Sequence, residues 1–452
     1  MKNTKRRTEI ISFYDRTGLE KHFTKMAKKG WMIENISNLC WTYRKIEPSD
    51  IHFCVTYYAG ASDFDPGPSD QQQTFYEFCS RTGWNLCCTW HQMQVFYNEA
   101  EDPIPLETDP LLEVYGIHKA ANKSFLSGHF ILLAIALLYC GYFVFNLLSD
   151  PITALSTAGT LMSACAYLFI FVLVGTELFT YYIWYAKAKR AAQIGRFTDT
   201  PSTKTFQLTL LSVFLVLYVT HLGRLIYNGG HIYLWITLWA FVLLIGVYFA
   251  VHAIKNKLQA SLAPKGLTIT LTVIIFVILY IGIIAVGAVV FSSSIKSGIL
   301  QPDQRRNEIP LSVTELTDAP EEHYLQHNQY NETILASHRV VQQYAHYEYE
   351  KLPDHPRLIY SITKSDIPPL FRWFKKFYLD GNAAGQTSPY NLKYTPTDPL
   401  PWGALEAYKQ LDDAGRPKNS FLLIYEDTII LIHFDDEPTD AEIAFVVGKL
   451  TP

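Results

Sequence analysis

The stretch LTITLTVIIFVILYIGIIAVGAVVFS, Leu267–Ser292, contains no charged residue. A helix needs about 20 apolar residues to cross the roughly 30 Å hydrocarbon core of a bilayer. Five segments of the chain meet this requirement, at 127–148, 158–185, 207–227, 232–253 and 267–291. A soluble chain of 452 residues could not bury five such runs in its core. The sequence therefore predicts a membrane protein with a five-helix transmembrane bundle.

Charge divides the chain into three parts around these spans. Residues 1–123 carry 14 Lys and Arg against 16 Asp and Glu, a net of −2. Residues 124–292 carry 9 against 3, a net of +6, and residues 293–452 carry 15 against 23, a net of −8. No part is basic enough to indicate a nucleic-acid partner. We predict an N-terminal domain at 1–123, a transmembrane region at 124–292 and a C-terminal domain at 293–452.

The loops between the spans predict the orientation in the plasma membrane. The loops after the second and fourth spans are basic, whereas 149–156 and 228–231 contain no Lys or Arg. Basic loops remain in the cytosol, so we expect a cytosolic N-terminus and, with five spans, an extracytoplasmic C-terminus. The start of the chain has no apolar signal-peptide core, and the first span is expected to act as the signal-anchor. The basic residues are Lys187, Lys189, Arg190, Arg196 and Lys204, then Lys255, Lys257 and Lys265.

Cysteine usage agrees with this orientation. Five of the seven cysteines lie in residues 1–123, and none follows Cys165. Free thiols persist in the reducing cytosol and are avoided outside it. Cys87 and Cys88, near His91, resemble a metal-binding group, but neighbouring residues of a strand point to opposite faces. We interpret both as structural cysteines.

Residues 8–98 contain one pattern twice. The first copy reads strand (10–14), helix (17–29), Gly30-Trp31, then strands at 32–36 and 40–46. The second reads strand (52–58), helix (71–81), Gly83-Trp84, then strands at 85–90 and 93–97. Each glycine stands where a helix end needs a left-handed residue. The pattern predicts an N-terminal α+β domain, a tandem βαββ repeat with one antiparallel sheet and both helices on one face. The other face is left for a partner, a second copy or the linker 99–123.

These residues carry a resemblance to a known family. The helix before Gly30-Trp31, the helix before Gly83-Trp84 and the aromatic hairpin ending at Phe96-Tyr97 resemble the bacterial membrane-protein family called domain of unknown function 2812. The resemblance implies an envelope protein of Gram-positive bacteria, with spans and a distal C-terminal domain in this order. The family has no assigned activity. Its genes often neighbour PadR-type transcriptional regulators, which implies a regulated envelope function.

Residues 298–452 predict a C-terminal α+β domain. Candidate helices cover 331–347, 366–378, 402–413 and 438–450, and candidate strands cover 358–361, 421–425 and 428–434. Glu426-Asp427 lies between the last two strands, as in a tight hairpin. The segment Asp380–Pro401 is rich in Gly, Asn, Ser and Pro, which indicates a long loop, either ligand-binding or mobile.

Five histidines fall between His323 and His355. His323 and His327 are four residues apart, a spacing that places two imidazoles on one helix face and can hold Zn²⁺. No third ligand follows at a metal-site spacing. The alternatives are a pH-sensing group and ordinary surface histidines. We expect no other cofactor.

Ionisable groups within the spans are candidates for a functional role. They are Glu177, His221 and Arg224. Glu177 lies on the inner half of its span, where His129 or His252 could contact it, and Arg224 lies near the outer end of its own span, where it can extend to the interface. A direct Glu177–Arg224 pair is not expected. A transport or proton-relay role would need a polar path through the bundle.

No catalytic motif is present, and we assign no catalytic residue. We interpret the chain as a non-enzymatic regulatory or sensory membrane protein. An extracytoplasmic domain would be coupled to a cytosolic domain that binds a protein or a nucleotide-like ligand. A transporter or transporter subunit is the first alternative, and an envelope hydrolase is the second. The expected partners are the lipid bilayer and a protein at the cytosolic domain, and an oligomer is compatible with the sequence.

Overall fold

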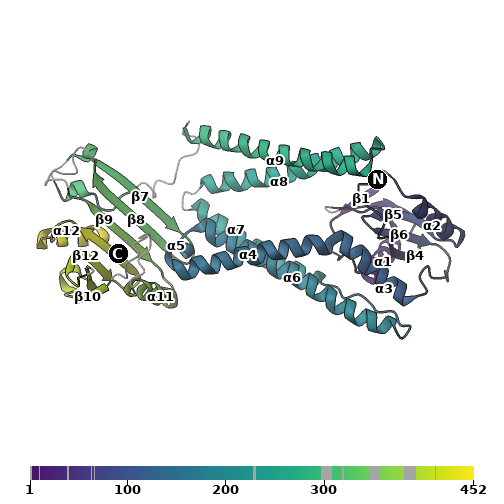
Figure 1. The fold of residues 1–452 in the computed structure, drawn as a ribbon, viewed down its shortest axis with the longest axis horizontal. Helices are drawn as coiled ribbons and strands as arrows, with labels where there is room; N and C mark the ends of the chain where they lie inside the picture. Colours follow the sequence, from purple (N-terminus) through teal and green to yellow (C-terminus); the bar gives the residue numbers. More distant parts are fainter. Residues whose placement is uncertain are drawn as a thin grey trace. The chain divides into compact units, whose positions relative to one another are not determined.

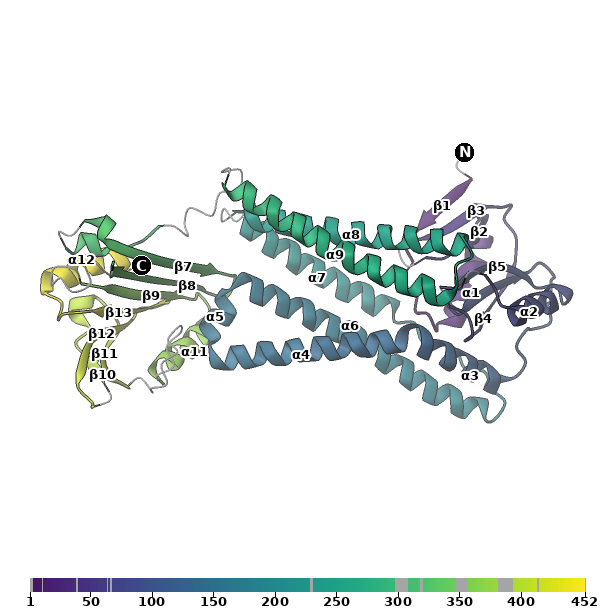
Figure 2. The same cartoon turned by 45° about the horizontal axis from the view of Figure 1, so that its top comes forward.

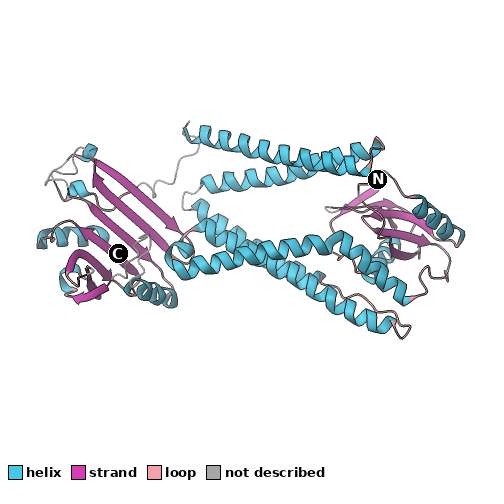
Figure 3. Ribbon diagram, viewed as in Figure 1, coloured by secondary structure: helices cyan, strands magenta, loops and turns pink. Residues whose placement is uncertain are grey.

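The computed structural model describes residues 3–9, 11–37, 40–62, 64–65, 67–227, 231–296, 308–317, 320–346, 356–380, 393–412 and 414–451. Two compact units are present. The first comprises Met1–Leu137, Leu168–Leu217 and Trp235–Ser293, and the second Leu138–Tyr167, Tyr218–Leu234 and Ser294–Pro452. The strands fall into two groups, residues 4–98 and 324–434 (Figures 1 and 3). We describe each unit by itself.

The first unit begins with two βαββ repeats. The first repeat consists of β1 (Thr4–Arg7), α1 (Arg16–Ala27), β2 (Trp31–Asn35) and β3 (Trp41–Lys45). The second consists of β4 (His52–Tyr57), α2 (Asp70–Arg81), β5 (Asn85–Trp90) and β6 (Met93–Asn98). Their strand orders are β1-β3-β2 and β4-β6-β5, so the last strand of each repeat is central in its sheet. The strand that follows the helix in each repeat contains a bulge, after Ile33 in β2 and after Leu86 in β5.

Two details of the predicted domain are wrong. The first strand lies at Thr4–Arg7 and pairs with β3, whereas residues 11–14 form no strand, because Phe13 and Tyr14 are buried in separate cores. The repeats form two three-stranded sheets rather than one. Their bulged strands β2 and β5 lie side by side without a ladder, and Cys87 Sγ donates to the Ile33 carbonyl at 2.8 Å (Figure 2). A bulge interrupts regular strand pairing.

The glycines at the ends of α1 and α2 have the predicted conformation. Gly30 has φ +76° and Gly83 has φ +85°. A Cβ at residue 30 would approach the Ile46 carbonyl oxygen to 2.9 Å. Trp84 is buried and its Nε1 donates to the Ile104 carbonyl at 2.8 Å. Each glycine therefore ends a helix and allows the chain to enter the next strand.

Long apolar helices follow the repeats. They are α3 (Pro110–Ala121), which continues through a π-helical turn at Asn122–Leu126 into α4 (Ser127–Ser149), then α6 (Ala158–Ala192), α7 (Lys204–Tyr227), α8 (His231–Ala260) and α9 (Lys265–Lys296). Among the described residues, four segments are long and apolar enough to cross a bilayer: Pro110–Ser149, Ala158–Ala192, Lys204–Arg224 and Lys265–Val289. They indicate a multi-pass membrane protein. The remaining expected span, 232–253, lies within α8, and several of its side chains are outside the described residues.

The second unit contains a seven-stranded antiparallel sheet. Its order is β10-β11-β12-β13-β9-β8-β7. The strands are β7 (Tyr324–Glu332), β8 (Ser337–Ala345), β9 (Leu358–Lys364), β10 (Lys393–Thr397), β11 (Glu406–Leu411), β12 (Pro417–Ile424) and β13 (Thr428–Phe434). Phe421 and Leu423 pack with α12 (Asp440–Leu450), whereas Leu422 and Ile424 pack with α11 (Pro368–Leu379) and α5 (Pro151–Ser156). Since side chains alternate along a strand, α11 and α12 cover opposite faces.

Two predicted helices of this domain are wrong. Residues 331–347 contain the end of β7 and all of β8, and residues 402–413 contain β11. Both segments pair with strands on each side, and such tertiary pairing overrides a weak helical pattern. The predicted helices at 366–378 and 438–450 correspond to α11 and α12. The hairpin at 426–427 connects β12 to β13. Part of the predicted loop at 380–401 forms β10, and residues 381–392 lie outside the described residues.

Candidate functional site

A polar junction connects the first repeat to the segment before α7. Ser12 Oγ lies 3.2 Å from Thr203 Oγ1, and Thr17 Oγ1 lies 2.8 Å from Thr200 Oγ1. The Thr200 hydroxyl donates to Asp15 Oδ1 at 2.5 Å. Asp15 also caps α1 by accepting from the Gly18 N–H. We call residues 12–17 with 200–203 the junction. It fixes the start of α1 to the loop between two transmembrane candidates.

An aromatic cluster lies beside these hydrogen bonds. Tyr14 is fully buried, and its ring centroid lies 5.0 Å from that of Tyr181 and 5.6 Å from that of Trp184, both on α6. Phe125, in the π-helical turn, stacks on Tyr14 at 5.9 Å. Each such ring pair contributes about 1 kcal/mol beyond the area that it buries. The cluster therefore joins the first repeat to α6 and to the start of α4.

Glu177 of α6 belongs to the same region. Its Oε2 accepts hydrogen bonds from Thr203 Oγ1 at 2.9 Å and from Gln207 Nε2 at 2.8 Å. The residue is 8% exposed. The expected contact with His129 or His252 is not formed among the described residues, where the Glu177 partners are at the beginning of α7. Glu177 thus supports the junction.

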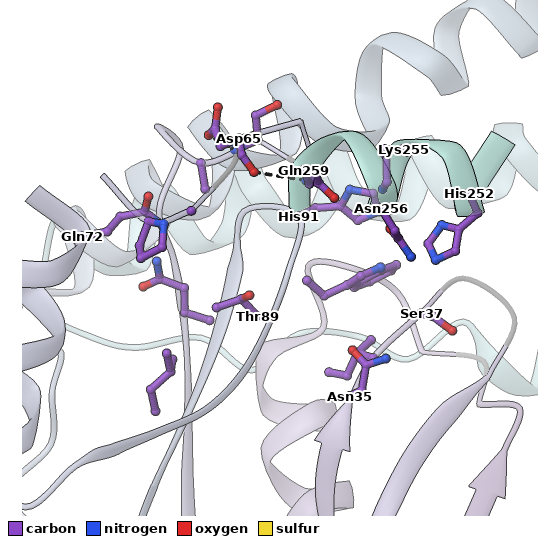
Figure 4. Close-up of a pocket in the computed structure, with 18 of the residues that line it drawn as sticks. Asn35, Ser37, Asp65, Gln72, Thr89, His91, His252, Lys255, Asn256 and Gln259 are labelled. Carbon is purple, nitrogen blue, oxygen red and sulfur yellow. Dashed lines mark hydrogen bonds between the residues drawn. The ribbon is translucent and has the colours of Figure 1, made fainter. Parts of the chain in front are cut away.

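A pocket of about 500 Å³ lies between the repeats and one face of α8. We call it the α8 pocket. Its walls come from the end of β2, the loop between β4 and α2, the first half of α2, the β5–β6 hairpin and the C-terminal part of α8. Figure 4 shows His252, Lys255, Asn256 and Gln259 along α8, with Asn35 and Ser37 facing them from the first repeat. This volume is typical of small-molecule sites.

The α8 wall is a polar stripe. Residues 248, 252, 255, 256 and 259 are separated by four, three, one and three positions, which places them on one helix face. Lys255 and Lys257 were expected in a basic loop after the fourth span, whereas α8 extends to Ala260. The helical spacing of Tyr248, His252, Lys255, Asn256 and Gln259 was the available signal for this site.

The loop between β4 and α2 is anchored to the end of α8 and the start of α9. Gln259 Nε2 donates to the Asp65 carbonyl at 3.1 Å, and Lys265 Nζ lies 3.0 Å from Asp65 Oδ1. Lys255 Nζ lies over the Phe64 ring, 5.9 Å from its centroid. These contacts hold one rim of the α8 pocket and compensate the only carboxylate among its described lining residues.

The opposite wall presents polar groups from the second repeat. His91 has φ +51°, a left-handed conformation that its two-residue hairpin requires and that few non-glycine residues adopt. Gln94 is 1% exposed and donates through Nε2 to the Tyr76 hydroxyl at 3.1 Å. The Gln94 Oε1 is buried and has no hydrogen-bond partner among the described residues. A buried acceptor without a donor is costly, so this oxygen favours a ligand with a donor group.

Comparison with known protein families gives a match to the N-terminal part of the chain. Residues 16–128 match the DUF2812 family. This match confirms the resemblance noted from Gly30-Trp31 and Gly83-Trp84. The family is described as a protein of unknown function. The match covers α1 to the start of α4, and the later helices and the seven-stranded sheet lie outside it. No curated protein and no solved structure matches the chain.

The DUF2812 region supplies all of the α8 pocket except the α8 stripe. The predicted zinc ligands lie elsewhere, in the second unit. His323 ends a short 3₁₀ turn (Glu321–His323) and His327 lies in β7, so the helix expected to align them is not formed. The described residues contain no group of three His, Cys, Asp or Glu side chains placed to hold a metal. Zinc binding by His323 and His327 stays a prediction.

The other two intramembrane candidates also lie outside the DUF2812 match. Arg224 Nη2 lies 3.2 Å from Glu332 Oε1 of β7, so its described partner is a carboxylate of the second unit. His221 is 8% exposed, and its Nε2 has no hydrogen-bond partner among the described residues. Glu177, His221 and Arg224 therefore belong to separate environments, and their functional roles stay predictions.

Proposed function

We propose that this chain is a regulatory or sensory multi-pass membrane protein without enzymatic activity. In this proposal the helices couple a cytosolic N-terminal domain (1–123) to an extracytoplasmic C-terminal domain (293–452). The transmembrane region (124–292) contributes five spans, with α8 as the fourth. The basic loops after the second and fourth spans support this orientation. The bilayer and a protein that binds the N-terminal domain are the proposed partners.

The main support for the proposal is that α4 and α6 each contribute side chains to a core of the first unit and to a core of the second unit. Within the first unit, Leu133 of α4 and Val174, Leu178 and Tyr181 of α6 belong to the core that contains Tyr14. Within the second unit, Phe143 and Leu147 of α4 and Leu161 of α6 pack with α5 and α11. A helix is a stiff element that transmits displacement when it has packed contacts at both ends. The continuous helices α4 and α6 therefore provide the physical connection that coupling needs.

A single hydrogen bond in the second unit allows a sharp test. Thr333 Oγ1 donates to the Leu155 carbonyl of α5 at 2.6 Å. Thr333→Val removes this bond, and the acceptor for the Leu335 and Ala336 N–H groups, with little change in volume. Thr451→Val is the control, because the only described partner of the Thr451 hydroxyl is the Val447 carbonyl of the final helix. Full-length protein in lipid nanodiscs would be analysed by hydrogen–deuterium exchange and mass spectrometry.

Coupling predicts faster exchange at residues 12–17 and 196–204 in Thr333→Val and unchanged exchange there in Thr451→Val. Leu155→Ala provides a second, larger perturbation of the same contact. If both variants alter only residues 151–156 and 324–345, the two domains are not coupled and the regulatory proposal is wrong.

A further inference from the structure

We propose that the α8 pocket binds a nucleoside phosphate, with the phosphate at the Lys255 end and the base at the Gln94 end. The inference deepens the proposed function, because it names the ligand class that a sensory protein of this design would detect. It rests on the composition of the two ends of the pocket.

One end of the pocket is cationic. Lys255 and His252 project from α8, and His91 is directed to the pocket by its left-handed turn. The lining carboxylate, Asp65, is paired with Lys265 outside the pocket, at 3.0 Å. An ammonium group and imidazole N–H donors are established partners of phosphate oxygens. This end therefore favours an anion with several acceptor oxygens.

The other end offers one acceptor and one donor next to each other. The Tyr76 hydroxyl accepts from Gln94 Nε2 at 3.1 Å and from Gln72 Nε2 at 3.4 Å, which leaves its own proton for a ligand acceptor. Burial raises the pKa of Tyr76, so the phenol remains protonated at neutral pH. Gln94 Oε1 is the adjacent buried acceptor without a partner. The edge of a nucleobase presents the complementary donor and acceptor side by side.

The two ends of the pocket differ in chemistry, which suits a molecule with two different parts. In Figure 4 Gln72 and Thr89 lie toward one end, and His252 and Lys255 lie toward the other. Trp90 and Tyr248 also line the pocket and provide ring surface for stacking. Inorganic phosphate would satisfy only the cationic end and would leave Gln94 Oε1 unpaired. The structure therefore favours a nucleotide over a simple anion.

The phosphate could also belong to a lipid headgroup, because α8 is one of the expected spans. The two sources are separated by the membrane composition. Full-length protein would be reconstituted into nanodiscs of phosphatidylcholine alone and of phosphatidylcholine with phosphatidylglycerol. Binding of AMP, GMP, CMP and inorganic phosphate would be measured by titration calorimetry in both.

The matched variants are Lys255→Ala and Lys257→Ala. They remove the same charge from positions two residues apart on α8, and only Lys255 lines the pocket. Gln94→Leu removes the buried acceptor. We expect at least one nucleotide to bind in neutral nanodiscs, more tightly than inorganic phosphate. Lys255→Ala should weaken it at least tenfold and Lys257→Ala less than twofold. Gln94→Leu should weaken nucleotide binding and leave phosphate binding unchanged.

Four results would overturn the inference. The first two are no nucleotide binding at millimolar concentration and an equal loss of nucleotide affinity in the two lysine variants. The others are phosphate binding as tight as nucleotide binding, and a ligand effect that appears only as competition with phosphatidylglycerol, which would assign the phosphate site to a lipid headgroup. Lys255→Gln repeats the charge test if Lys255→Ala unfolds. The exchange experiment above uses no nucleotide, so failure of ligand binding and failure of coupling are distinguishable.

Discussion

The Glu177 carboxylate accepts a hydrogen bond from the Thr203 hydroxyl at 2.9 Å, and Thr203 Oγ1 lies 3.2 Å from Ser12 Oγ. This relationship joins α6, the segment before α7 and the first repeat through three side chains. Removing the carboxylate should therefore loosen a contact between a transmembrane candidate and the first domain.

We expect Glu177→Leu to lower stability by about 2 kcal/mol, because Thr203 and Gln207 both lose the charged oxygen that accepts their hydrogen bonds. Glu177→Gln keeps one acceptor oxygen and should cost less than half as much. Thermal unfolding of the full-length protein in nanodiscs measures both. Equal stability of Glu177→Leu and the parent would show that the junction does not depend on this carboxylate.

Arg16 should be a further stabilising residue of the first repeat. Its guanidinium lies 2.5 Å from Glu113, 3.2 Å from Glu107 and 3.5 Å from Glu20. Arg16→Ala leaves three largely buried carboxylates together without a cation, and we expect a loss of about 3 kcal/mol. Lys28→Ala is the control, because its exposed pair with Asp50 should contribute at most about 0.5 kcal/mol. Chemical unfolding of the full chain compares them, and similar losses would contradict the assignment.

Gly30 and Gly195 separate backbone strain from steric contact. Both have left-handed φ values, +76° and +73°, but only at residue 30 would a Cβ meet another group, the Ile46 carbonyl oxygen at 2.9 Å. Gly195→Ala should cost about 1 kcal/mol. Gly30→Ala should cost about 1–2 kcal/mol more, because the backbone oxygen must move. If thermal unfolding shows equal losses of stability for the two variants, the Ile46 carbonyl can move away from residue 30 at little cost.

His338 should make the second unit sensitive to acid. It is buried in β8, its Nδ1 lies 2.9 Å from Thr363 Oγ1, and burial lowers its pKa to about 4. The unfolded value is about 6.5, so the unfolded state binds more protons between these values and stability falls as pH drops from about 6.5 to about 4. The full loss is about 3 kcal/mol. His338→Gln should flatten this part of the stability–pH profile, and an unchanged slope would exclude His338 as its cause.

The number of spans predicts the location of the C-terminus. With five spans, a C-terminal alkaline phosphatase fusion should be active and a green fluorescent protein fusion should be dark. The reverse pattern would indicate an even number of spans, in which α8 does not cross the bilayer. Fusions after residue 196 provide the control, since that basic loop should give the cytosolic pattern.

Local physical chemistry was sufficient for several predictions. Gly30 and Gly83 were identified because a left-handed helix end has a local residue preference. The long apolar helices followed from composition alone, because the bilayer thickness sets their length. The family resemblance depended on the same helix–Gly-Trp pattern, and the family match confirms it for residues 16–128.

Only the tertiary structure decided the rest. Residues 337–345 became a strand because β7 and β9 pair with them on both sides, a contact that no local pattern contains. The polar stripe of α8 forms a pocket wall because the second repeat lies opposite to it. Thr200 and Thr203 belong to no sequence motif, yet their hydroxyls lie within hydrogen-bond distance of residues more than 180 positions earlier in the chain. Such long-range contacts depend on how the whole chain packs, whereas helix ends and membrane spans depend on neighbouring residues and the solvent.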